Sequence, residues 1–194
     1  MNVGLTGGIG CGKTTVVESF AKLGWRTVQS DKVVRDLIEN DDLVRDAILG
    51  RWGGEVLNKE IHSINRQAVA EIVFNDSEEL NWLEELLHPK VRQVWTASLS
   101  QDASARVLVE IPLLFEKSLE TAFDLTVCIT SPLEIVSKRM LQRGFNEVDI
   151  QRRMARQLPL AAKVKRANYV LSNSGSLEFL YKQVNRLNEI ISTS

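Results

Sequence analysis

The chain has 194 residues, of which 44% are hydrophobic, and its formal net charge is −1. This length is typical of one core domain with a sizeable insertion, and the composition allows a real core to be buried. A nearly neutral chain lacks the general basic surface of nucleic-acid-binding proteins, so no nucleic acid and only a small partner is expected. No apolar run approaches the roughly 18 residues of a membrane helix, so no membrane partner is expected either. Nothing in the pattern indicates an oligomeric state.

The N-terminal residues and the cysteines bear on location. A glycine turn begins within a few residues of Met1, which leaves no room for a signal peptide. The two cysteines lie far apart in the sequence and cannot make the framework of a disulfide-rich secreted protein. We therefore expect a cytoplasmic protein.

A glycine-rich turn follows the first expected strand, residues 2–6. Its sequence, Gly7-Gly8-Ile9-Gly10-Cys11-Gly12-Lys13-Thr14, fits the pattern G-x-x-x-x-G-K-[ST]. Glycines allow backbone conformations that a Cβ forbids, and the helix expected over residues 13–23 adds a positive N-terminal dipole. We favour a triphosphate site over a merely structural turn. Lys13 would then serve the β- and γ-phosphates, and the Thr14 hydroxyl would be the protein ligand for Mg²⁺.

Asp31 follows the second expected strand, residues 25–28. A strand, a helix and a parallel strand with a right-handed crossover bring the carboxyl ends of both strands to one edge of the sheet. Asp31 is therefore expected near the phosphate loop, as a candidate catalytic carboxylate. The alternative, that Asp31 only caps the next helix, is equally compatible with the spacing.

Residues 32–100 are predicted to be a helical insertion without a convincing strand. Residues 76–79 have the form of a capping box that opens a helix through Leu87, and Pro89 indicates a break or a new first turn. The segment is longer than a simple crossover requires, so we interpret it as a subdomain that holds an acceptor. A lone histidine on a helix is more often structural than ligand-binding, but the candidate anion or hydroxyl contacts here are Arg35, Arg66 and His88.

Two further strands are expected over residues 106–111 and 125–129. The first is followed by an apolar loop at the ligand edge of the sheet, Pro112-Leu113-Leu114-Phe115-Glu116. Glu110 lies where P-loop enzymes often carry an acid that orients magnesium-bound water. After the next strand, Ser131-Pro132-Leu133-Glu134 combines a capping box with proline at the first helical position, which predicts a helix to about Gln142.

The densest basic cluster comes next: Arg139, Arg143, Arg152, Arg153, Arg156, Lys163, Lys165 and Arg166. Asn146 is expected to cap a helix over residues 147–158. A solvated helix face is the plain interpretation, and we favour it for Arg153 and Lys165. For Arg139 and Arg143, next to the sheet edge, we favour a phosphate role, since a hinged basic helical pair can act as a lid over bound phosphates.

The chain ends with a strand over residues 169–171, the loop Asn173-Ser174-Gly175 and a helix over residues 177–191. The predicted fold is α/β: a P-loop NTPase-type parallel five-stranded sheet flanked by helices, with a helical insertion and a helical lid. The nucleotide core comprises residues 1–31, 101–138 and 167–194. Residues 32–100 form the acceptor domain, and residues 139–166 form the lid.

Kinase is the reaction class that fits these parts best. Guanine-specific switches use N-K-x-D, and the nearest sequence here, Asn58-Lys59-Glu60-Ile61, lacks the final aspartate. Other ATPases usually end a core strand with a Walker-B aspartate, for which Glu110 is a poor substitute. Two alternatives stay open: a P-loop kinase of another small nucleoside or nucleotide, and a non-catalytic ATP-binding regulator.

Several blocks of the chain, in one order, resemble the dephospho-coenzyme A kinase family along nearly the whole length. The blocks are Leu5 through Thr15; Asp31 with Arg35; Asn81-Trp82-Leu83 through Leu87-His88-Pro89; Glu110 through Glu116; Lys138-Arg139 to Arg143; Gln157; and Ala167 through Asn173-Ser174-Gly175-Ser176. The resemblance implies ATP-dependent phosphorylation of the ribose 3′-hydroxyl of dephospho-CoA, the last step of coenzyme A synthesis. It also implies a nucleotide core, a helical CoA domain and a lid.

The resemblance also implies roles for the matched residues, with ATP and Mg²⁺ as cofactors and dephospho-CoA as acceptor. Asp31, Lys13 and Arg139 are the implied catalytic groups, with Asp31 receiving or orienting the acceptor proton. The implied ATP-binding residues are Gly8, Ile9, Gly10, Cys11, Gly12, Lys13, Thr14, Thr15, Arg143 and Asn173, the last beside the adenine. The implied acceptor-binding residues are Asp31, Arg35, His88, Pro112, Leu113, Leu114 and Glu116.

The chain departs from the family pattern at a few positions. Gln29-Ser30-Asp31 stands where Asp-Ala-Asp is common, so the first carboxylate is absent, and Asn168 replaces a frequent Asp. Cys11 replaces a frequent Ser. As a thiol at a helix N-terminus beside Lys13, Cys11 is expected to have a lowered pKa and to be prone to oxidation, unless it is simply a small residue that points away from solvent.

Overall fold

The computed structural model describes residues 1–58, 63–102 and 104–192. The chain divides into two compact units. The first comprises Met1–Gln29 and Gln101–Ser194, and the second comprises Ser30–Ser100. Residues 139–166, the predicted lid, belong to the first unit.

A five-stranded parallel sheet forms the centre of the first unit, with strand order β2-β5-β1-β6-β7. Its strands are β1 (Asn2–Gly7), β2 (Arg26–Gln29), β5 (Val107–Glu110), β6 (Leu125–Thr130) and β7 (Tyr169–Ser172). The strands are rich in buried apolar residues because both faces of a parallel sheet are covered. Glu110 is in register with both Leu5 and Gln29, so the carboxyl ends of these strands lie at one edge. The predicted sheet is confirmed.

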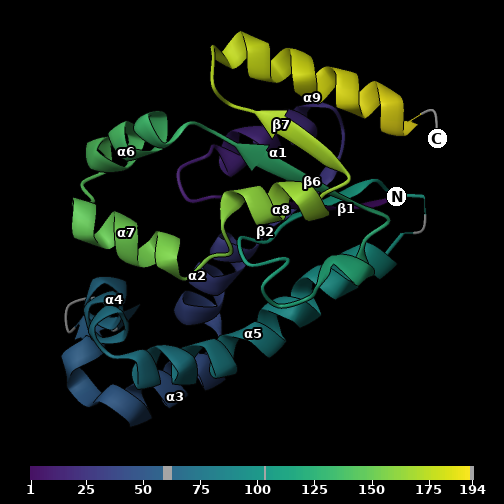
Figure 1. Ribbon diagram of the computed structural model, residues 1–194. Helices are drawn as coiled ribbons and strands as arrows, with labels where there is room; N and C mark the ends of the chain where they lie inside the picture. Colours follow the sequence, from purple (N-terminus) through teal and green to yellow (C-terminus); the bar gives the residue numbers. More distant parts are fainter. Residues whose placement is uncertain (59–62, 103, 193–194) are drawn as a thin grey trace. The chain divides into compact units, whose positions relative to one another are not determined.

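Helices flank this sheet. They are α1 (Lys13–Lys22), α6 (Leu133–Gln142), α7 (Glu147–Ala155), α8 (Leu160–Arg166) and α9 (Leu177–Ser192), with a 3-10 turn, η2 (Glu120–Ala122). In Figure 1, α8 lies in front of the sheet and α1 lies behind it. Phe20 of α1 and Leu180 of α9 are fully buried in one core with Leu5 of β1. The sheet is therefore covered on both faces, and its carboxyl edge carries the loops.

Two helix boundaries in this unit differ from prediction. Helix α6 begins without a side-chain cap, because Ser131 donates its hydroxyl hydrogen bond to the Asn173 carbonyl at 2.9 Å instead. Helix α7 is capped by Asn146 as predicted, but it ends at Ala155 rather than at residue 158. Tertiary hydrogen bonds form at both helix ends. Near the start of α6, the Ser131 hydroxyl donates to the Asn173 carbonyl, and past the end of α7, the Leu158 N–H donates to Glu116 Oε1.

The second unit is mostly helical. It contains α2 (Ser30–Asn40), α3 (Asp42–Trp52), the 3-10 turn η1 (Gly53–Val56), α4 (Arg66–Asn75) and α5 (Ser77–Ser100). The prediction that it has no strand is wrong, because β3 (Leu57–Asn58) and β4 (Ser63–Ile64) pair antiparallel. Two residues per strand are too few to show a period-two pattern. Residues 59–62 lie outside the described chain, and with them most of the Asn58-Lys59-Glu60-Ile61 sequence that argued against a guanine site.

Helix α5 continues through Pro89, so the predicted break there is wrong. Proline removes one backbone hydrogen bond and strains the preceding turn. Burial of Leu83, Leu87, Val91 and Trp95 at helical spacing along α5 offsets this cost. The start of the helix is as predicted, since the Asp76 carboxylate accepts hydrogen bonds from the backbone N–H groups of Glu78 and Glu79 at 2.8 and 3.4 Å.

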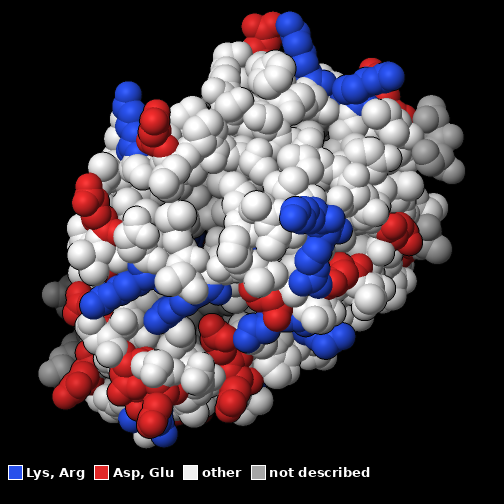
Figure 2. Space-filling view, viewed as in Figure 1, with Lys and Arg blue, Asp and Glu red and all other residues white. Residues whose placement is uncertain are grey.

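The surface carries charges of both signs. On the face shown in Figure 2, basic and acidic side chains both occur and neither sign covers that face. Within the described ranges, no helix combines the length and the apolar character that crossing a membrane demands.

Candidate functional site

The phosphate loop lies between β1 and α1 and has the backbone that its glycines allow. Gly10 and Gly12 have φ angles of 68° and 100°, in the left-handed region that favours glycine. The Cys11 N–H donates to the Gly8 carbonyl at 3.3 Å and closes a tight turn. A Cβ on Gly12 would lie 2.2 Å from Nδ2 of Asn173, so this position is closed to any side chain.

Lys13 lies across the loop that precedes it. Its Nζ donates hydrogen bonds to the carbonyl oxygens of Gly7 and Gly8 at 3.3 and 3.1 Å. The ammonium is thus held at the mouth of the glycine turn, where a bound phosphate would meet it. Thr14, in the first turn of α1, is exposed, and its hydroxyl has no hydrogen-bond partner among the described residues.

Asn173 and Arg139 brace the same loop from the neighbouring strand and helix. Asn173 is buried, and its Nδ2 donates to the Cys11 carbonyl at 2.9 Å. The Arg139 guanidinium donates to Oδ1 of Asn173 at 3.3 Å and to the Gly10 carbonyl at 3.5 Å. The structure therefore brings both predicted residues to the phosphate loop. It does not bring Arg143 there: this residue is exposed at the end of α6, and its side chain has no polar partner in the described ranges.

The expectation of an activated thiol at Cys11 is wrong. Cys11 is 1% exposed, and burial raises the pKa of its thiol above the usual value, although the Lys13 ammonium acts in the opposite direction. Desolvation penalises the thiolate more than the nearby positive charge favours it. The interpretation of Cys11 as a small residue that points away from solvent is the one the structure supports.

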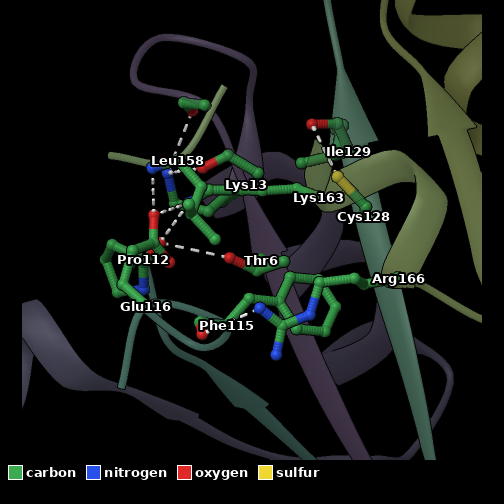
Figure 3. Close-up of polar contacts among 12 residues, drawn as sticks. Thr6, Lys13, Pro112, Phe115, Glu116, Cys128, Ile129, Leu158, Lys163 and Arg166 are labelled. Carbon is green, nitrogen blue, oxygen red and sulfur yellow. Dashed lines mark hydrogen bonds and ion pairs between the residues drawn. The ribbon is translucent and has the colours of Figure 1, made fainter. Parts of the chain in front are cut away.

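The loop of residues 112–116 is tied to the edge of the sheet by its backbone. The Pro112 carbonyl accepts hydrogen bonds from the Thr6 hydroxyl at 3.2 Å and from Lys163 Nζ at 2.7 Å (Figure 3). Leu114 is fully buried and therefore closed to a ligand, so the structure does not support its predicted acceptor contact, whereas Pro112 and Leu113 are partly exposed. Sequence reasoning placed the loop at the correct edge but did not foresee its anchors.

A buried ion pair joins this loop to α8. Lys163 is fully buried, and its Nζ lies 2.8 Å from Oε1 of Glu116. The same oxygen accepts the Leu158 N–H at 2.8 Å, and the second oxygen, Oε2, is buried without a hydrogen-bond partner among the described residues. Burial lowers the pKa of the Lys163 ammonium, and the Glu116 carboxylate opposes that shift. Sequence analysis counted Lys163 only as part of a basic cluster, and no local signal marks it as buried.

The remaining predicted acceptor residues belong to the second unit. Asp31 lies inside the first turn of α2, and its carboxylate accepts no backbone hydrogen bond in the described chain, so the capping alternative is wrong. Arg35 follows one turn later on the same helix, and both side chains are exposed. His88 lies on α5 with its Nε2 3.8 Å from the Glu84 carboxylate. Arg66 forms an ion pair with Glu39 at 3.0 Å.

The chain is similar to dephospho-CoA kinases over almost its whole length. The family model for dephospho-CoA kinase matches residues 1–178. The dephospho-CoA kinase of Aquifex aeolicus (strain VF5) is 37% identical over 190 residues, which cover 96% of this chain and 95% of that protein. The solved structure of TT1252 from Thermus thermophilus matches with a TM-score of 0.80 at 32% identity, covering 97% of this chain and 96% of that chain. The dephospho-CoA kinase from Campylobacter jejuni matches with a TM-score of 0.71 at 26% identity, covering 100% of this chain and 98% of that chain.

The buried pair gives a stability prediction. Lys163→Met leaves the Glu116 carboxylate buried and uncompensated, so we expect the free energy of unfolding to fall by about 3 kcal/mol or more. The double variant Lys163→Met/Glu116→Gln removes both charges and should recover most of that loss. Chemical denaturation measures both, with exposed Lys165→Met on the same helix as a control within about 0.5 kcal/mol of the parent. A Lys163→Met protein as stable as this control would contradict a structural role for the pair.

Proposed function

The chain belongs to the dephospho-CoA kinase family, and from that premise we propose that it transfers the γ-phosphoryl group of ATP to the ribose 3′-hydroxyl of dephospho-CoA. The product would be coenzyme A, at the last step of its synthesis. The observation that carries the proposal is the phosphate loop, in which Lys13 and two left-handed glycines follow a buried parallel strand. The two buried cysteines, Cys11 and Cys128, are free thiols, which fits a cytoplasmic location.

Phosphoryl transfer needs positioning and charge neutralisation more than nucleophile activation. In the proposed mechanism, backbone N–H groups of residues 8–15, other than that of Cys11, which is bonded to the Gly8 carbonyl, hold the β- and γ-phosphates. Lys13 exchanges its bonds to the Gly7 and Gly8 carbonyls for bonds to phosphate oxygens. Arg139 lies against the Gly10 carbonyl, where its charge can stabilise the negative charge on the transferring group.

A divalent cation fits the residues at the start of α1. Mg²⁺ usually keeps several waters and takes one or two protein ligands together with substrate phosphates. Thr14 offers an exposed hydroxyl with no competing hydrogen bond among the described residues. Bound there, Mg²⁺ would neutralise charge on the phosphates, and the role of Thr14 would be to hold it.

The acceptor side of the proposal assigns residues 32–100 to CoA binding. Covalent geometry keeps the Cα of Asp31 within about 8 Å of the Cα of Gln29, at the carboxyl end of β2. Asp31 would accept or orient the proton of the 3′-hydroxyl. Arg35, His88 and the partly exposed Pro112 and Leu113 would contact the rest of dephospho-CoA, while the buried Leu114 and the ion-paired Glu116 would hold their loop in place.

The proposed lid comprises residues 139–166, which include the two basic helices α7 and α8. Its closing would exclude water from the transferring group and bring Arg143 to the phosphates. The nucleotide core would comprise residues 1–31, 101–138 and 167–194. Asn173 follows β7 and donates to the Cys11 carbonyl, so its proposed part in ATP binding is at the phosphate loop rather than beside the adenine.

The direct test is ADP formation by the purified protein with ATP, Mg²⁺ and a panel of acceptors. We expect dephospho-CoA to be the preferred acceptor, with the new phosphate on the ribose 3′ oxygen by ³¹P and ¹H NMR. Preference for another nucleoside or nucleotide would identify a different P-loop kinase. ATP binding without ADP release for any acceptor would identify a regulator.

Asp31→Asn tests the proposed proton acceptor. Loss of a general base typically costs at least 10²-fold, so we expect kcat to fall by roughly 10²-fold with the fold intact. Asp36→Asn, on the same helix, is the matched control and should keep kcat within a factor of about two. Steady-state kinetics with dephospho-CoA measure both, and parental turnover in Asp31→Asn would remove Asp31 from the mechanism.

A further inference from the structure

Asn173 forms hydrogen bonds with other protein groups through both its backbone and its side chain. It is 3% exposed, although it lies in a loop directly after β7. Its backbone N–H donates to the Thr130 carbonyl at 2.8 Å, and its own carbonyl accepts the Ser131 hydroxyl at 2.9 Å. Its side chain donates to the Cys11 carbonyl and accepts from Arg139. A side chain so held has its position fixed by the protein before any ligand is bound.

The bond to Cys11 fixes one particular peptide plane. Because a trans peptide is planar, its C=O and its N–H point in opposite directions. Holding the Cys11 carbonyl toward Asn173 therefore turns the Gly12 N–H away from Asn173. The Gly12 N–H has no acceptor among the described residues, whereas the neighbouring Cys11 N–H is already bonded to the Gly8 carbonyl. The Gly12 N–H is thus a hydrogen-bond donor that is available to a ligand of the phosphate loop.

The close approach of Asn173 explains the glycine at position 12. A Cβ there would lie 2.2 Å from Asn173 Nδ2 and 3.4 Å from its Cγ. Arg139 adds to the contacts of Asn173 with the loop, because it also donates to the Ser131 hydroxyl at 3.4 Å and to the Gly10 carbonyl. The carbonyls of Gly10 and Cys11 are therefore both held by side chains outside the phosphate loop.

We propose that Asn173 is a positioning residue for phosphoryl transfer. It fixes the Cys11–Gly12 peptide so that the Gly12 N–H addresses a phosphate oxygen, and it holds the guanidinium of Arg139 beside the loop. It acts on the phosphates through these two groups and does not select the base. The inference rests on the proposed function for its kinetic readout, but its binding readout needs only the nucleotide.

The test compares Asn173→Ala with the parent for ATP and for GTP. Losing the fixed orientation of a backbone donor should lower kcat by on the order of 10²-fold, as removal of one preorganised donor does elsewhere. The ratio of kcat/KM for ATP to that for GTP should stay within about threefold of the parental ratio. Asn173→Asp keeps an acceptor for Arg139 but sets a carboxylate oxygen against the Cys11 carbonyl, so it should not recover activity.

Asn168→Ala is the matched control, because Asn168 bridges β6 and β7 at their other end. Its Oδ1 accepts from the Thr126 N–H at 2.7 Å and from the Thr126 hydroxyl at 3.0 Å, away from the phosphate loop. It should lose stability comparable to Asn173→Ala in thermal unfolding yet keep kcat within about twofold. Equal kcat losses in the two variants would reduce Asn173 to a structural role and overturn the proposal.

Two other outcomes would also overturn it. A collapse of the ATP-to-GTP ratio with kcat retained would mean that Asn173 recognises the adenine directly. Parental kcat in Asn173→Ala would mean that the Cys11–Gly12 peptide keeps its orientation without the hydrogen bond from Asn173. If the parent shows no transfer to dephospho-CoA, calorimetric titration with Mg-ATP still tests the proposal. Weaker ATP binding in Asn173→Ala than in Asn168→Ala would support the positioning role of Asn173, and equal binding would contradict it.

Discussion

The structure depends on a constraint within the phosphate loop: the Cys11–Gly12 peptide must turn its carbonyl toward Asn173 and its N–H away from Asn173. Backbone freedom alone does not achieve this, because glycines such as Gly10 and Gly12 lower the cost of many conformations equally. The carbonyls of Gly10 and Cys11 accept hydrogen bonds from Arg139 and Asn173, two side chains from outside the loop. Side chains from outside the loop thus select one conformation from the many that glycine permits.

The same edge of the sheet is reinforced below the loop by a buried ion pair. Lys163 reaches from α8 to both Glu116 and the Pro112 carbonyl, and Glu116 also accepts the N–H of Leu158, where the chain passes from α7 to α8. Such a pair need not raise stability, because two charges must be desolvated to make it. What it contributes is specificity: residues 112–116 and the start of α8 have fixed positions beside the phosphate loop. Segments far apart in sequence are thereby joined at one site.

Much of this arrangement was predictable from the sequence. The parallel sheet follows from short apolar strands alternating with helical segments, and the phosphate loop follows from its spacing after a strand. The caps at Asn146 and Asp76 are local signals that the structure keeps. The acceptor role of residues 32–100 and the lid role of residues 139–166 were inferred from segment length, basic charge and family resemblance, and they stay predictions.

The structural features that could not be predicted from the sequence depend on contacts between residues that are far apart in the chain. Pro89 stays helical because buried side chains of α5 outweigh one lost hydrogen bond, and Ser131 leaves its local cap to bond Asn173. Cys11 has the neighbours that would activate a thiol, yet burial decides the direction of its pKa shift. Lys163 occurs in a polar stretch that looks solvated, and only the fold reveals that it is buried.

The central claim is that the phosphate loop and Asp31 serve one reaction, the attack of a ribose hydroxyl on the γ-phosphorus of ATP. A crystal structure of the protein with a non-hydrolysable ATP analogue, Mg²⁺ and dephospho-CoA measures this directly. The account predicts the ribose 3′ oxygen about 3 to 3.5 Å from the γ-phosphorus, in line with the bridging oxygen, with the Asp31 carboxylate hydrogen-bonded to that hydroxyl. A complex in which Asp31 points away from the ribose, or in which another hydroxyl faces the γ-phosphorus, would contradict it.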